Sequence, residues 1–469
     1  MQIAEPTSTL SRFRSIGLYS LVLYCLLAVF FGIVQASKAQ FDVVVLATTG
    51  ALAGLYFYGL RYVRNCPTSL ILIFAIAFSL VGLFTIPFDS TDVFFYMATG
   101  WAQTHYQINP YSTSLRETTG ADDDPMIHNR WMERSRNPWV DLPLAYGFLF
   151  AVVVRAIAWL GHGHFWTTLV LFKLLNLLTH AGTAALLWKS SRFLPDVNPK
   201  TVLYLYAWNP FVVLEYLANV HNDILVGFLI ALAVYALLSG RLFWTIPALA
   251  AAGLVKYVTF ILVPFAFIFL GRQQGWVKAI RSVLLACALV VFCGLPYFGQ
   301  IGAFKYGLIA TQLSESTGSL HAFLFYSYRA VVRLWPSLAG SLPTFSALTG
   351  IALWFIVSAF IVLEFYASRS DKFLKTETTI LRWFLILFAI IFIASSKFWA
   401  WYIGMLFPLA LLTRRKTILA DAVIFMSCTH MLSFASLRTK TLGYVLFATI
   451  IPIVWTAIAS SMTKRVADI

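Results

Sequence analysis

The stretch from Phe88 to Tyr111 follows a long apolar run and places two aspartates, Asp89 and Asp92, just after that run ends. A carboxylate in such a place can accept the proton of an attacking hydroxyl group and so act as a general base. An aspartate there can equally cap a helix at the membrane boundary, because Asp is favoured at helix N-termini. We expect one of the two aspartates to cap a helix and the other to take part in chemistry.

A second polar group lies in the segment WNPFVVLEYLANVHND, where the Asn-Pro pair at 209–210 is expected within a helix and Glu215 near its outer end. His221, Asn222 and Asp223 close the segment, and they also suit the cap of a helix that begins at Ile224. His221, Asp223 and a carboxylate of the first group could bind a divalent metal, although their spacing matches no fixed metal motif. We predict no cofactor and keep a metal site as an alternative.

A single lysine, Lys256, lies in the apolar segment AAGLVKYVTF. A charged side chain at the centre of a membrane costs about 2.5–3.5 kcal/mol on insertion scales, so it needs a charged partner or a water-filled cavity. Lys256 is therefore a candidate functional residue. The alternative is a structural ion pair with Glu215 or Asp223.

The composition of the 469-residue chain is typical of a helical protein that crosses a membrane many times, since 60% of residues are hydrophobic and 11% are charged. The apolar runs continue for about 20 residues, whereas strands of a membrane barrel alternate over about 10. The formal charge of +15 comes from Lys and Arg clusters at the ends of apolar runs, which indicates membrane orientation and not nucleic-acid binding. The five cysteines show no disulfide or zinc pattern.

The positive-inside rule predicts how the chain crosses the membrane. Arg61 and Arg64 mark a cytoplasmic loop between the second and third apolar runs, so the third run ends outside. The acidic stretch Asp89–Asp141 then becomes a first outer loop, which would carry the catalytic residues. The first three crossings are expected at Ile16–Val34, Phe41–Leu60 and Ser69–Phe88.

Two later segments are not expected to cross as single helices. If Leu142–Leu160 crossed, every later loop would be inverted, so we predict a juxtamembrane or re-entrant helix on the outer face. The next crossing is expected at Phe165–Trp188. Between Arg241 and Arg272 the chain must leave and return within about 30 residues, which favours two half-helices that break between residues 253 and 257.

The apolar runs together predict an all-α polytopic protein of the plasma membrane with about 13–14 crossings and both termini in the cytoplasm. A second outer loop is expected at Phe298–Pro343. Because no soluble segment is large enough to fold alone, residues 1–469 are expected to form one integral-membrane domain. No GxGxxG or GxxxxGK[ST] loop occurs, so a nucleotide site has no sequence support.

The order of these motifs resembles the GT-C superfamily of integral-membrane glycosyltransferases, and within it the bacterial polyprenol-phosphate-mannose-dependent α-1,6-mannopyranosyltransferases. That family carries D-x-x-x-Y, a glycine and N/D-P-Y in its first outer loop, then N-P, E, H-N-D and L-x-K-Y, and later P-W-Y. It usually also shows Pro-Tyr-Gly-Pro after the first loop, of which this sequence keeps Tyr146-Gly147 and loses the proline that follows them. The matching residues here are Asp92, Tyr96, Gly100, Asn109-Pro110-Tyr111, Asn209-Pro210, Glu215, His221-Asn222-Asp223, Leu254, Lys256, Tyr257, Trp401 and Tyr402, with Ala400 in place of the later proline.

The resemblance implies a GT-C-like bundle and a glycosyltransferase, with mannose as the expected sugar. It would move the hexose from a polyprenyl-phosphate donor to a glycan or glycolipid acceptor outside the membrane, with inversion. Asp92, in register with Tyr96, is the predicted general base, and Lys256 and His221 are expected to stabilise the charge developing on the phosphate. The residues expected to bind substrate are Asp89, Tyr96, Asn109, Tyr111, Glu215, His221, Asn222, Asp223, Lys256, Trp401 and Tyr402.

Two alternatives stay open. A related GT-C enzyme could transfer another sugar or use a lipid or protein acceptor, since the motif-bearing loops do not identify the acceptor. A transporter of lipid-linked sugars would place Lys256 and Asp223 along a pathway. Transporters usually contain paired inverted repeats with similarly broken helices, and the single broken pair predicted here disfavours that class.

Overall fold

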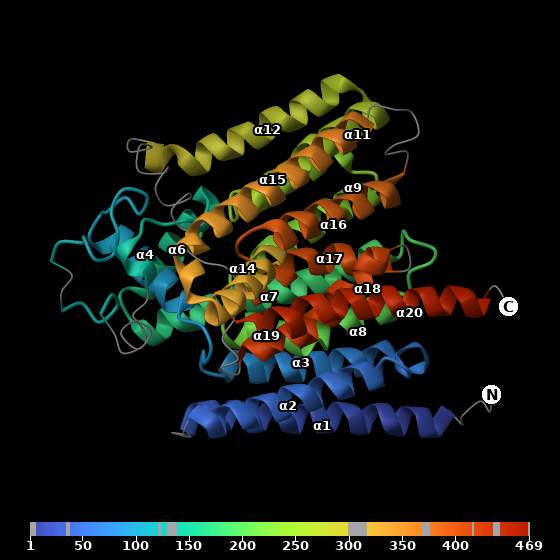
Figure 1. Ribbon diagram of the computed structural model, residues 1–469. Helices are drawn as coiled ribbons and strands as arrows, with labels where there is room; N and C mark the ends of the chain where they lie inside the picture. The colour runs from blue at the N-terminus through green and yellow to red at the C-terminus, as the bar shows by residue number, and fades with distance from the viewer. Residues whose placement is uncertain are drawn as a thin grey trace. The chain divides into compact units, whose positions relative to one another are not determined.

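The computed structural model describes residues 6–33, 38–120, 123–128, 138–298, 317–367, 376–414, 417–434 and 441–467, and the regular elements in these ranges are all helices (Figure 1). A helix satisfies its backbone hydrogen bonds internally, as lipid surroundings require. The elements used below are α1 (Pro6–Ile33), α2 (Lys38–Gly59), α3 (Thr68–Phe84), α4 (Asp92–His105), α6 (Phe148–Gly161), α7 (Phe165–Ser191), α8 (Pro199–Ala207), the π-helical η3 (Val212–Ala218), α9 (Asp223–Leu238), α10 (Thr245–Gly253), the 3-10 segment η5 (Tyr257–Leu262), α11 (Val263–Gln274), α12 (Trp276–Gly294), α14 (Leu320–Leu334), α15 (Leu342–Ala367), α16 (Glu377–Ala394), the 3-10 segment η8 (Ala400–Tyr402), α17 (Ile403–Thr413), α18 (Ile418–Thr429), α19 (Leu442–Val445) and α20 (Ile451–Ala467).

The chain forms two compact units, each built from several stretches of sequence. The expectation of one membrane domain over the whole chain stays a prediction. Unit 1 comprises Met1–Ile76, Leu187–Val212 and Glu315–Ile469, and unit 2 comprises Ala77–Leu186 and Val213–Ser314.

Seven helices of the described residues are long and apolar enough to cross a membrane. A hydrocarbon core about 30 Å thick needs about 20 apolar residues at a rise of about 1.5 Å each. The pair η3 and α9 meets the same criteria together but is bent by 114°. The fold class predicted from the sequence, an all-α polytopic membrane protein, is confirmed, whereas the total of about 13–14 crossings stays a prediction. The seven spans are Thr9–Gly32, Phe41–Gly59, Phe165–Ser191, Tyr257–Gln274, Trp276–Phe298, Pro336–Leu363 and Leu442–Ala459.

The helix expected through the Asn-Pro pair is interrupted there, which corrects the prediction. α8 ends at Ala207 and η3 begins at Val212. Pro210 has no N–H to continue a helix, and the Asn209 side chain bridges the break because its Oδ1 accepts from the N–H of Phe211 at 2.9 Å. The chain resumes as a π-helix, a rare form that is frequent at functional sites.

The segment predicted to form the first outer loop is partly helical in its described part, which leaves out residues 121–122 and 129–137. α4 begins at Asp92, its N-cap is Thr91, and Asp89 therefore does not cap it. The segment expected to form a juxtamembrane helix is helical only from Phe148, as α6. Of the second outer loop, residues 299–316 lie outside the described ranges, and α14 follows them.

The break predicted between residues 253 and 257 is confirmed. α10 ends at Gly253, Lys256 is extended, and the chain continues through η5 into α11. α9, α10, α11 and α12 pack against one another in unit 2. The irregular backbone at the break is thus surrounded by helices, which is the condition under which non-helical backbone is tolerated at membrane depth.

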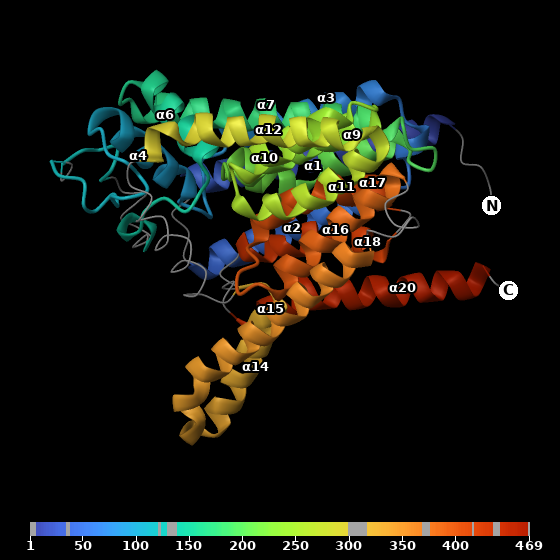
Figure 2. The same ribbon diagram turned by 90° about the horizontal axis from the view of Figure 1, so that it is seen from above.

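In unit 1, α14 and α15 lie side by side as a helical hairpin (Figure 2). Tyr328 of α14 stacks on Phe345 of α15, with ring centroids 4.1 Å apart. Most large side chains of α15 are exposed, among them Ile351 and Phe355. An apolar helix with an uncovered surface suits contact with lipid tails.

The contact of α4 with α6 depends on Gly100. A Cβ atom at this position would lie 2.2 Å from the carbonyl oxygen of Val154 in α6. Because that atom belongs to the backbone, the clash cannot be relieved by a side-chain rotation. Gly100 therefore lets the two helices approach closely, as small residues do between membrane helices.

We predict that Gly100→Ala lowers the free energy of unfolding by about 1–3 kcal/mol, because α4 and α6 must move apart to admit the methyl group. Thermal unfolding of the detergent-purified chain measures the change. Gly54→Ala in α2 is the control, since a Cβ there meets no atom within 4 Å. Equal unfolding temperatures for the two variants would contradict this account.

Candidate functional site

Asp92 meets two residues that are distant from it in the sequence, Glu215 and His221, in the interior of unit 2. Asp92 Oδ2, at the start of α4, lies 3.4 Å from Nδ1 of His221. His221 Nε2 lies 3.8 Å from Oε1 of Glu215 in η3. The exposed fraction is 8% for Asp92 and 0% for His221 and Glu215. Buried ionisable groups need partners of opposite charge, and the imidazole between two carboxylates supplies one.

Lys256 lies in an ion pair within the same unit. Its Nζ is 2.6 Å from Oδ1 of Asp223, the first residue of α9. The ammonium group also lies 5.7 Å from the ring centroid of Tyr146, a cation–π contact. The ion pair raised as an alternative for Lys256 is therefore present, with Asp223 as its partner.

Tyr146 connects the motifs of this unit, although its role was not predicted from the sequence. Its hydroxyl lies 3.2 Å from that of Tyr96, whose own hydroxyl is 3.4 Å from Asp92 Oδ2. Its backbone carbonyl accepts hydrogen bonds from the hydroxyls of Tyr111, at 2.9 Å, and Tyr257, at 3.0 Å. The signal available in the sequence was the Tyr-Gly pair retained from the family pattern.

The position after Tyr146 has room only for a glycine, Gly147. A Cβ atom there would lie 2.2 Å from the carbonyl oxygen of Leu254. The Gly147 N–H donates to the carbonyl of Val255 at 3.1 Å, and the Leu149 N–H donates to that of Leu254 at 3.0 Å. The start of α6 is therefore held against the break that carries Lys256.

Asn219 holds the chain just before α4 against the turn that follows η3. Its Oδ1 accepts from the N–H groups of Phe88, at 2.9 Å, and Asp89, at 3.2 Å. Its Nδ2 donates to Glu215 Oε2 at 3.1 Å. The next residue, Val220, has a φ of 64°, which is strained for a β-branched side chain and is typical of functional sites. Sequence reasoning passed over both residues.

Asn222 occupies the N-cap of α9, but its side chain makes no capping hydrogen bond, so the capping alternative raised from the sequence does not hold for the amide. Among the described residues, neither amide atom of Asn222 has a hydrogen-bond partner, and the same holds for Glu215 Oε1 and Asp223 Oδ2. A buried group left without its hydrogen bond costs about 1–3 kcal/mol. These atoms are therefore suited to receive the hydroxyl groups of a ligand.

Four other predicted residues have described positions. The Asn109 Oδ1 accepts from the N–H of Tyr111 at 3.0 Å, which makes a turn. Trp401 and Tyr402 belong to η8 in unit 1, where Trp401 stacks on Trp399 with centroids 4.9 Å apart. A substrate contact for any of these residues stays a prediction.

No group of three His, Cys, Asp or Glu side chains within the described ranges is arranged to hold a metal ion. Asp92 and Glu215 lie beside different nitrogens of the His221 ring, at 3.4 and 3.8 Å. The described geometry therefore supports ion pairing and hydrogen bonding at this cluster.

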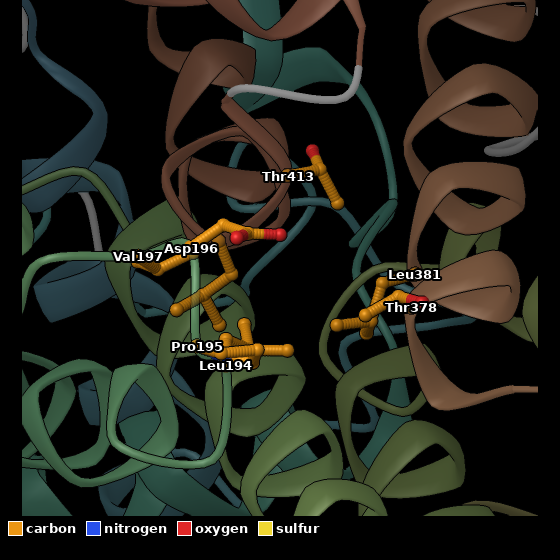
Figure 3. Close-up of a pocket in the computed structure, with 8 residues that line it drawn as sticks. Leu194, Pro195, Asp196, Val197, Thr378, Leu381 and Thr413 are labelled. Carbon is orange, nitrogen blue, oxygen red and sulfur yellow. The ribbon is translucent and has the colours of Figure 1, made fainter.

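A small pocket in unit 1 lies between the loop after α7 and the helices α16 and α17 (Figure 3). Its lining is mostly apolar, with Asp196, Thr378 and Thr413 as polar members. None of the predicted site residues lines it. The chemistry-bearing residues of unit 2 are not part of this pocket.

The surroundings separate the two aspartates of the first loop. Burial raises the pKa of Asp92, but the close contact with His221 and the positive charges of His221 and Lys256 outweigh it, so the pKa lies below its ordinary value. Asp89 is exposed, yet the protein packed around it and the charges of Glu215 and Asp92 raise its pKa. Asp92 is thus the aspartate held in the ionised form that a general base needs.

Residues 19–272 match the family described as alpha-(1->6)-mannopyranosyltransferase, N-terminal domain, and this match covers more than half of the chain. The chain belongs to this family. The resemblance drawn from its motifs is therefore confirmed, and the chain is a membrane-embedded mannosyltransferase. Asp92, Glu215, His221 and Lys256 lie in the matched part, whereas Trp401 lies beyond it. No curated protein and no solved structure matches the chain.

We predict opposite effects of pH on two matched variants. A carboxyl whose folded-state pKa is depressed, such as Asp92, stabilises the fold above its unfolded pKa of about 3.9, and this stabilisation is lost as the pH falls through the folded pKa. Asp92→Asn should therefore unfold at a lower temperature than the wild type at pH 7, with the gap closing on acidification.

Asp89 has a raised folded-state pKa, so the wild type loses stability as the pH rises above about 3.9 towards that value. Asp89→Asn should therefore unfold at a higher temperature than the wild type at pH 7, and this gap also closes on acidification. Thermal unfolding of both variants between pH 2 and 8 measures the two trends, because the Asp92→Asn gap closes below about pH 3.9 and the Asp89→Asn gap closes above it. Effects of the same sign would contradict the assignment.

Proposed function

We propose that this mannosyltransferase takes mannose from a polyprenyl-phosphate donor and adds it, in α-1,6 linkage, to a glycan or glycolipid acceptor with inversion at the anomeric carbon. The observation that carries the proposal is the contact of the buried, ionised Asp92 with His221, beside the Lys256–Asp223 ion pair. Family membership supports mannose as the sugar, and the family's description supports the α-1,6 linkage. The donor, the stereochemistry and the residue roles are our inference.

In the proposed reaction the acceptor hydroxyl attacks the anomeric carbon of mannose. Its oxygen forms the new C–O bond, its proton passes to a carboxylate oxygen of Asp92, and the bond from the anomeric carbon to the phosphate oxygen breaks. The electron pair of that bond leaves with polyprenyl phosphate. A single displacement inverts the configuration and needs one carboxylate base, unlike the two carboxylates of retaining glycosidases.

The leaving phosphate gains negative charge, and Lys256 is the residue we propose to stabilise it. Its ammonium group is already held by Asp223 and faces Tyr146, so little reorganisation is needed when a phosphate approaches. The hydrogen-bonding atoms of Asn222, Glu215 and Asp223 that lack described partners are proposed to bind sugar hydroxyls. These roles divide the cluster between the phosphate and the sugar.

The reaction is proposed to take place on the extracytoplasmic face, with both termini in the cytoplasm. The basic clusters at the ends of apolar runs favour this orientation. A lipid-linked donor also suits a chain whose sequence lacks any nucleotide-phosphate loop. A single cysteine placed in the first loop can be labelled in intact cells with a reagent that does not cross the membrane. Labelling from outside would support the proposed orientation, and this test does not depend on the chemistry.

We predict that Asp92→Asn lowers kcat for transfer from synthetic polyprenyl-phosphate mannose to an α-1,6-mannose oligosaccharide by about 10²–10⁴-fold, because the acceptor proton loses its base. Asp89→Asn makes the same chemical change three residues away and should lower kcat much less than Asp92→Asn, because Asp89 is expected to bind substrate and not to take the proton. Transfer should also persist in the presence of a strong chelator.

Three results would contradict this proposal. Loss of transfer in Asp89→Asn with near wild-type transfer in Asp92→Asn would exchange the roles of the two aspartates. Loss of activity with the chelator and its return with added divalent ions would show that a metal takes part. Movement of lipid-linked mannose across liposomes without transfer would favour a transporter.

A further inference from the structure

Lys173 is a buried lysine in the middle of α7, and the mechanism proposed above does not use it. Its exposed fraction is 5%. Its Nζ donates to four backbone carbonyl oxygens: Gly82 at 3.3 Å, Thr85 at 2.7 Å, Leu217 at 3.0 Å and Ala218 at 3.1 Å. All five residues belong to unit 2.

The four carbonyls come from the ends of two helical segments. Gly82 and Thr85 lie at the end of α3, and Leu217 and Ala218 end η3. The last carbonyls of a helix have no partner within it and carry the negative end of the helix dipole. An ammonium group with three N–H donors therefore gives a partner to the carbonyls of Thr85, Leu217 and Ala218, while the Gly82 carbonyl also accepts from the Thr85 N–H at 3.3 Å.

Both chain ends that Lys173 holds lead directly into the candidate site. Thr85 precedes the stretch that carries Asp89 and Asp92, and Ala218 precedes the turn that carries His221. One helical turn further along α7, the Asn176 amide donates to the carbonyl of His221 at 3.2 Å. The same face of α7 thus contacts both segments of the chain, the one that leads to Asp92 and the one that leads to His221.

We propose that Lys173 is a positioning residue for the transfer reaction: by pinning the ends of α3 and η3 to one point, it sets the distance between Asp92 and His221. The expected effect on the rate rests on the proposed function. The claim that Lys173 fixes the ends of α3 and η3 does not. A displacement of about 1 Å in a reacting group can cost about 10²-fold in rate. Lys173 therefore acts on catalysis through the two segments that it joins and touches neither of the two site residues.

The test compares Lys173→Met with Thr183→Val in the full-length protein. Thr183 lies in the same helix, is also buried, and its hydroxyl donates to the Thr179 carbonyl one turn back at 2.8 Å. We expect Lys173→Met to lower kcat for transfer from synthetic polyprenyl-phosphate mannose by about 10–100-fold, with the donor KM changed less than about 3-fold. Thr183→Val should keep both constants.

Hydrogen–deuterium exchange supplies a readout that does not depend on activity. Lys173→Met should exchange faster than the wild type in peptides that cover residues 82–92 and 214–223, and at the wild-type rate in peptides from α12. Faster exchange throughout the chain, or a fall in transfer that only follows the folded fraction, would mean a general role in stability and would overturn the proposal.

Lys173→Gln serves if the Met variant does not fold, because an amide keeps two N–H donors. If the variant that folds has the kcat and the hydrogen-exchange rates of the wild type, the proposal is overturned. It is also overturned if neither variant folds. If the wild type transfers no mannose from the lipid donor, the proposed function fails, while the exchange pattern still decides whether Lys173 fixes the two segments.

Discussion

The arrangement of unit 2 depends on the cost of burying charge. Asp92, Glu215 and Asp223 are carboxylates in an apolar helical body, and each has a cationic or imidazole partner in His221 or Lys256. Removal of one member would leave an uncompensated charge, which costs several times more than the pair contributes. The groups are therefore required to meet, and the helices that carry them must end or break where they do.

The breaks in the helices follow from that requirement. The π-helical η3 and the turn after it bend the chain by 114°, and a second break after α10 leaves Lys256 in extended backbone. Backbone groups exposed by such breaks need new partners inside the protein. Asn219, the Tyr146 carbonyl and the Lys173 ammonium group take part in meeting this need. The same contacts that repair the backbone also position the chemistry.

Sequence reasoning found most of the charged residues of the cluster because an ionisable group in an apolar run is conspicuous. It missed Tyr146 and Asn219, whose types are common at membrane boundaries and in turns and so carry no separate signal. It also expected one of the two aspartates to cap a helix and raised capping as an alternative for residues 221–223, but Asp89 does not cap α4 and the Asn222 side chain makes no capping hydrogen bond. Caps are decided by backbone angles over a few residues, and propensity alone does not fix which candidate occupies the position.

The sequence by itself determined the class of the fold, the broken helix near Lys256 and the family, since these depend on local hydropathy, charge and the order of short motifs. Only the tertiary structure decided that His221 lies between Asp92 and Glu215 and that Asp223 takes Lys256 as its partner. Those pairings join positions more than 30 residues apart in the case of Lys256 and more than 120 in that of Asp92. A local sequence pattern does not show which residues so far apart in the chain will pair. The pairing follows from how the helices pack.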